Sequence, residues 1–93
     1  METLTFENEL RREGFADIET KSVESNKHVG AHSHPFDVCA KVLAGEITLT
    51  FAGESHTYRT GDVFTMKAGC EHSEQCGPAG VSYTVGRRHK TTA

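Results

Sequence analysis

Apolar and polar residues alternate along much of this chain with a period of two, the pattern of half-buried β-strands. The clearest example is 47–51, where Ile47, Leu49 and Phe51 alternate with threonines. Further strands are predicted at 15–24, 36–43, 55–59, 63–66 and 81–87, and extended chain at 27–34 and 71–76. Turns are predicted at 25–26, 44–46, 52–54, 60–62, 68–70 and 77–80. Short strands separated by glycine turns at spacings of about ten residues are typical of an antiparallel sandwich or barrel.

The first residues follow a helical period instead. Phe6 and Leu10 are four positions apart and form one small apolar stripe. We expect a short N-terminal helix over 6–13, with Thr5 as its N-cap and Gly14 as its stop. A helix this short needs a surface on which to dock.

Length and charge narrow the possible roles. The chain has 93 residues, enough for a single domain over 1–93, and its small size favours a homodimer. The net charge is −3 and no long basic run is present, so we expect neither a nucleic-acid nor a membrane partner. The three cysteines form no C-x-x-C pair, and no secretory signal follows Met1. These features predict a cytoplasmic protein with reduced thiols.

Two histidines suggest a metal site. On an extended strand, His32 and His34 point to the same face about 7 Å apart, close enough to share an ion. On the same alternation His72, Glu74 and Cys76 share a face further along the chain. Three neutral imidazoles can hold a divalent ion and leave positions open for water or a ligand. Without His72 in register, the first two histidines would more simply be solvated residues of an exposed strand.

The spacing of these residues resembles that of a small single-domain cupin of the RmlC-like superfamily. The first cupin motif, G-x5-H-x-H-x3-4-E-x6-G, matches over 26–45 at Asn26, His32, His34, Val38 and Gly45. The second, G-x5-P-x-G-x2-H-x3-N, matches over 61–76 at Gly61, Lys67, Gly69, His72 and Cys76. The resemblance implies an all-β fold, an antiparallel double-stranded β-helix or jelly-roll barrel, with metal ligands at His32, His34 and His72.

One departure from the family pattern bears on function. Val38 stands where the family carries a glutamate ligand. Asp37 is one residue out of phase and faces away on regular pleating, although a bulge could turn it inward. Glu74 is in phase with His72 and could bind the ion, orient a histidine or act as the catalytic acid–base group.

The resemblance implies a divalent transition metal (Zn, Ni, Mn or Fe) that acts on or binds a small organic molecule. Two alternatives stay open: a non-enzymatic module that binds a small ligand or senses metal, and a metal-free barrel. Whether the protein is an enzyme is left open. The residues expected to line the pocket are Phe36, Val38, Phe51, Phe64, Met66 and Tyr83.

Overall fold

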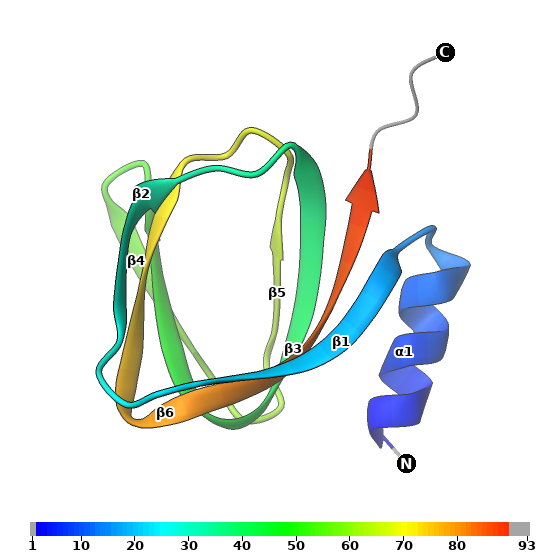
Figure 1. Cartoon of the computed structure of the whole chain (residues 1–93), viewed down its shortest axis with the longest axis horizontal. Helices are drawn as coiled ribbons and strands as arrows, with labels where there is room; N and C mark the ends of the chain where they lie inside the picture. The colour runs from blue at the N-terminus through cyan, green and yellow to red at the C-terminus, as the bar shows by residue number, and fades with distance from the viewer. Residues whose placement is uncertain (1, 90–93) are drawn as a thin grey trace.

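A computed structural model describes residues 2–89. One helix is followed by six strands that wrap around a common interior, while the helix lies outside them beside β1 (Figure 1). The elements are α1 (Glu2–Arg12), β1 (Ala16–Val23), β2 (His28–His32), β3 (Phe36–Phe51), β4 (Glu54–Arg59), β5 (Val63–Met66) and β6 (His72–His89).

The helix differs from its prediction mainly at its start, and it ends one residue earlier, at Arg12. It begins at Glu2, so Thr5 lies inside it and the predicted N-cap is wrong; threonine inside a helix costs only a fraction of a kcal/mol, about 0.5. The apolar stripe is confirmed, because Phe6 and Leu10 are buried and pack against Phe15. Gly14, at φ 88°, ends the helix as expected.

Two long strands, β3 and β6, form the centre of the sheet. All pairings are antiparallel, in the order β1-β6-β3-β4, with β2 also on β6 and β5 also on β3. The first half of β3 pairs with the second half of β6, and the reverse holds for their other halves. The sheet curls around the interior (Figure 1), as expected for a double-stranded β-helix. Within residues 2–89 no pairing joins β1 to β4, so the barrel is not closed by hydrogen bonds.

The turns predicted at 44–46 and 77–80 are wrong, because β3 and β6 continue through these residues as unbroken strands. Here both strands bend together. Gly45 pairs with Val81 and the next pairing is Ile47 with Cys76, so 77–80 form a wide bulge on β6. A Cβ at Gly45 would lie 2.1 Å from the carbonyl oxygen of Gly80. The glycines thus permit a close backbone approach at a bend rather than a chain reversal.

The core lies between the two halves of the folded sheet. Ile47 and Leu49, on the strand with the clearest alternation, are each only 1% exposed, which confirms that prediction. The remaining buried members of this cluster are Val38, Ala40, Val42, Phe64, Met66, Cys76, Val81 and Val85. The core fills one part of the interior. The last residue of β2 and the first residues of β6 lie beside it and form the site described next.

Candidate metal centre

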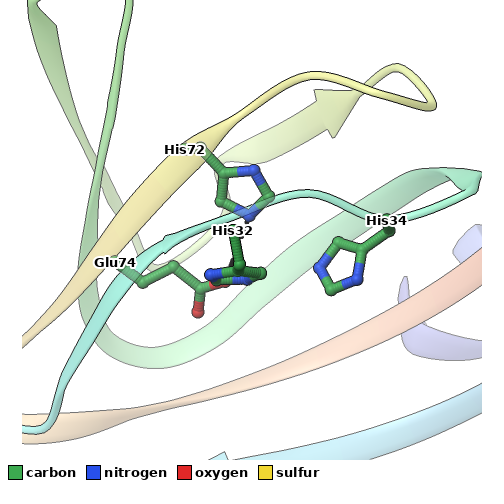
Figure 2. Close-up of side chains that lie close together, drawn as sticks. All are labelled: His32, His34, His72 and Glu74. Atoms are coloured by element: carbon green, nitrogen blue, oxygen red, sulfur yellow. Dashed lines mark hydrogen bonds and ion pairs between the residues drawn. The ribbon is translucent and has the colours of Figure 1, made fainter.

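Four side chains from two places in the chain meet inside the barrel. His32 ends β2, His34 follows in the loop to β3, His72 opens β6, and Glu74 comes two residues later. Figure 2 shows the carboxylate of Glu74 turned toward His32, with His72 and His34 on either side. One ligand atom from each residue lies within 4.8 Å of the others. His72 is buried, and the other three are half-buried.

The backbone fixes how two of the rings present their nitrogens. His32 Nδ1 lies 2.7 Å from the carbonyl oxygen of Gly30, and His72 Nδ1 lies 3.0 Å from that of Cys70. A carbonyl oxygen only accepts, so each Nδ1 carries the donated proton. In the neutral rings each Nε2 is therefore a free acceptor with a lone pair, the form that binds a metal.

These two Nε2 acceptors face a third acceptor, the carboxylate of Glu74. Glu74 Oε2 lies 3.2 Å from His32 Nε2 and 3.3 Å from His72 Nε2. Two lone pairs and a carboxylate oxygen repel each other unless a proton or a cation lies among them. Donors on one ion at about 2.1 Å each are at most about 4.2 Å apart, so small side-chain rotations bring this set into range. The residues therefore fit a divalent metal.

His34 is the least constrained of the three histidines. Its ring stacks on that of Phe36, with centroids 5.0 Å apart. Burial lowers the pKa of His34, and the neighbouring His32 and His72 lower it further, against an opposing effect of Glu74. A lowered pKa favours the neutral imidazole, which is the metal-binding form.

Val38, at the position of the family glutamate, and its neighbour Asp37 are not directed at this cluster. Val38 is buried and lines the adjoining cavity. Asp37 points elsewhere: its Oδ1 accepts a hydrogen bond from the Ala68 backbone at 2.8 Å, and its Oδ2 accepts two from Arg88, the shorter at 3.1 Å. Asp37 therefore ties the first residues of β3 to the β5–β6 loop and to β6, and Glu74 is the carboxylate that meets the histidines.

A cavity of about 240 Å³ adjoins the cluster. A larger hollow of about 530 Å³, between α1 and the outer face of β3 and β5, contains none of the ligand candidates. Phe51, predicted to line the pocket, instead stacks on His56 near the end of β3. The lining residues are Lys21, His32, His34, Phe36, Val38, Ile47, Phe64, Met66, Glu74, Tyr83, Val85 and Arg87.

Two cationic residues of this lining, Lys21 and Arg87, were not anticipated from the sequence. Arg87 continues the inward alternation of Tyr83 and Val85, which is the signal that could have found it. Lys21 pairs with Tyr83 across β1 and β6. It lies two residues before Val23, which packs on the core, in a regularly paired stretch of β1, so alternation counted from Val23 is the signal that could have found it.

The curled antiparallel sheet and the histidine cluster at its open end define a β-barrel protein with a candidate metal centre. The family model for the cupin domain matches residues 21–76, which is more than half of the chain. The chain belongs to the cupin family, as the two motifs implied.

Solved structures share the fold at low sequence identity. A conserved protein of unknown function from Streptococcus pyogenes is 24% identical, with a TM-score of 0.68 over 80% of this chain and 65% of its own. A cupin-2 domain protein from Shewanella frigidimarina is 19% identical (TM-score 0.63; 73% and 66%). A Klebsiella pneumoniae protein with a double-stranded β-helix domain is 18% identical (TM-score 0.67; 82% and 69%). The chain thus spans about two thirds of each.

No curated protein matches the chain. Within residues 2–89, no helix has the length and apolar character needed to cross a lipid bilayer.

Proposed function

We propose that this cupin holds one divalent transition-metal ion through His32, His34 and His72, with Glu74 as a fourth ligand, and that a small organic molecule binds beside it. The observation that carries the proposal is the pair of Nε2 acceptors facing Glu74 Oε2, at 3.2 and 3.3 Å. Each of these rings is held in the metal-binding tautomer by a backbone carbonyl.

The cavity supports the second half of the proposal. Its apolar side chains, such as Phe64 and Met66, exclude water from one side of the site. At about 240 Å³ it is smaller than the roughly 300–1,000 Å³ of drug-sized ligand pockets, so a small molecule fits it best. A bound ion would supply Lewis-acid polarisation of a ligand oxygen or nitrogen.

Metal analysis tests the site directly. Wild-type protein, stripped of metal and reloaded with zinc, nickel, manganese or iron, should retain about one ion per chain after gel filtration. His72→Ala should lose at least about a hundredfold in affinity, since it removes a ligand held in place by Cys70. His28→Ala is the matched control, because His28 is exposed on β2 and bonds Gln75 instead. Wild type that binds none of the four ions contradicts the proposal.

The Glu74→Gln variant distinguishes two possible roles of Glu74, that of a metal ligand and that of a proton-transfer group. If Glu74 is a ligand, the variant loses much of its metal affinity, because an amide oxygen is a weaker ligand than a carboxylate. If Glu74 instead moves protons in an enzyme, the variant keeps its metal and loses turnover of small acids, thiols or phenols. The ligand role favours a binding module, since Glu74 is the only carboxylate among the cavity-lining residues that the structure describes.

A further inference from the structure

The cavity is also lined by two polar residues, Lys21 and Tyr83, whose side chains no other group of the described residues engages in a hydrogen bond or ion pair. Lys21 on β1 and Tyr83 on β6 are register partners, and both side chains line the cavity. Within residues 2–89, the Lys21 side chain makes no ion pair or hydrogen bond, and the Tyr83 hydroxyl has no hydrogen-bond partner and is not fully buried. Two adjacent donors, one of them charged, thus face the same space.

The third polar group of this wall, Arg87, is already engaged. Its guanidinium forms an ion pair with Glu19 at 2.8 Å and donates to the backbone oxygen of Asp17 at 3.0 Å. It also lies over the ring of Phe36, 5.9 Å from its centroid. Arg87 therefore adds little uncompensated charge, and the ammonium of Lys21 is the cation left for a ligand.

The net charge of the cavity also favours an anionic ligand. Glu74 is the one carboxylate among its described lining residues, and a divalent metal ion would more than offset it. The loaded cavity would then carry excess positive charge from both the ion and Lys21. The apolar part of the lining is formed by Phe36, Val38, Ile47, Phe64, Met66 and Val85. A cationic or dipolar ligand matches this distribution poorly, whereas a small anion with an apolar body matches it well.

We propose that Lys21 and Tyr83 form an anion-binding subsite, and that the ligand of this cupin is a small carboxylate with an apolar body. The carboxylate accepts hydrogen bonds from Lys21 Nζ and the Tyr83 hydroxyl, and the body packs on the aromatic and aliphatic wall toward the metal. This ligand class rests on the proposed small-molecule function, but the subsite is built from residues that bind no metal.

Matched pairs of acids and amides test the charge requirement. Zinc-loaded protein is titrated by calorimetry with benzoate and benzamide, isobutyrate and isobutyramide, and phenylacetate and phenylacetamide. At least one acid should bind tenfold or more tightly than its amide, because Lys21 forms a stronger, charge-assisted hydrogen bond with a carboxylate than with a neutral amide oxygen. Amides that bind as well as their acids, or three acids that all fail to bind, would overturn the proposal.

Substitutions locate the subsite. Lys21→Met should weaken the best acid by roughly tenfold or more and Tyr83→Phe by a few-fold, while Lys21→Arg should restore most of the binding. Lys27→Met is the control, since Lys27 is exposed and pairs with Glu24 outside the cavity. Unchanged acid binding in Lys21→Met would contradict the subsite, and the same loss in Lys27→Met would show a general charge effect and contradict it too.

Metal affinity is measured separately in each variant with a competing chromophoric chelator. Lys21→Met should keep the zinc affinity of the wild type, whereas His34→Ala should lose it. If wild type binds none of zinc, nickel, manganese and iron, the metal proposal fails, and the acid–amide comparison is made on the metal-free protein. Acid binding that still depends on Lys21 there would support the subsite alone, and its absence would overturn it.

Discussion

At the scale of single residues, the carboxylate that meets the histidines comes from the second motif rather than the first. Glu74 lies on the same strand as His72, two residues further on, so the pleat directs both side chains to one face. The position that carries the family glutamate is filled by the buried Val38. A search for the family glutamate would therefore judge this site incomplete, although a carboxylate is present within it.

Asp37 is predicted to matter for stability and not for the metal. Asp37→Ala removes the acceptor for the Ala68 N–H and the partner of Arg88. We expect a loss of about 1–3 kcal/mol in the free energy of unfolding, measured by urea titration, with zinc affinity unchanged. A large loss of zinc affinity in a variant that remains folded would contradict this and would make Asp37 part of the metal centre.

Tyr83 is predicted to make stability fall in alkaline solution. Burial, reinforced by the charge of Glu74, raises the pKa of Tyr83 to about 12 from an ordinary value near 10. Because folding favours the neutral phenol, its contribution is fully present below pH 10 and is lost as the pH rises toward 12.

Unfolding free energies of wild type and Tyr83→Phe at pH 9 and pH 11 check this. Wild type should lose more stability than the variant over this interval, since phenylalanine cannot ionise. Equal losses in the two proteins would show that other groups cause the alkaline instability.

At the scale of elements, the close contact between β3 and β6 gives a sharp prediction about two glycines. Gly45 and Gly53 have nearly the same φ, 75° and 78°, so alanine is strained at both. A Cβ at Gly45 would also collide with the Gly80 carbonyl oxygen at 2.1 Å, whereas nothing lies within 4 Å of one at Gly53.

Gly53→Ala should therefore cost about 1–2 kcal/mol, the strain of the left-handed conformation alone. Gly45→Ala should cost about 3 kcal/mol or more, because the backbones must also move apart. Thermal and urea unfolding of the two variants would measure the difference, and equal costs would argue against the close approach.

The same elements explain what the sequence could and could not predict. Alternation identified the half-buried strand containing Ile47 and Leu49, and motif spacing brought His32, His34 and His72 together. Glycines such as Gly45 and Gly80 give the same local sequence signal whether they stand in a tight turn or at a bend between two long strands. Only the pairing of Gly45 with Val81, set by the whole fold, separates these cases.

The site was predicted in part for a similar reason. Period-two counting from His72 correctly put Glu74 on the same face as that histidine, and regular pleating correctly turned Asp37 away. Lys21 escaped prediction because the apolar residues of β1 pack on both sides of the sheet. Ile18 packs against the cluster beside the helix and Val23 against the barrel core, so the hydrophobic pattern alone does not tell which side Lys21 faces.

At the scale of the whole molecule, a homodimer remains a prediction. A domain of this size buries a limited share of its surface, and association would add to it. Val63, on β5, is a large apolar side chain that is 47% exposed, and a partner could cover it. Light scattering at micromolar concentration should give twice the monomer mass of 10.2 kDa. A monomer under these conditions would contradict the prediction.

The attachment of β2 has a consequence for how metal and fold would be coupled. Among residues 2–89, this strand pairs with β6 alone, at His28, Val29 and His32. An ion held by His32, His34 and His72 would cross-link the His32 end of β2 to β6. Loss of the ion would then first open β2 locally, visible as faster amide hydrogen exchange there, while β3 and the second half of β6 stay protected. In this barrel the metal would govern the order of one edge rather than the existence of the fold.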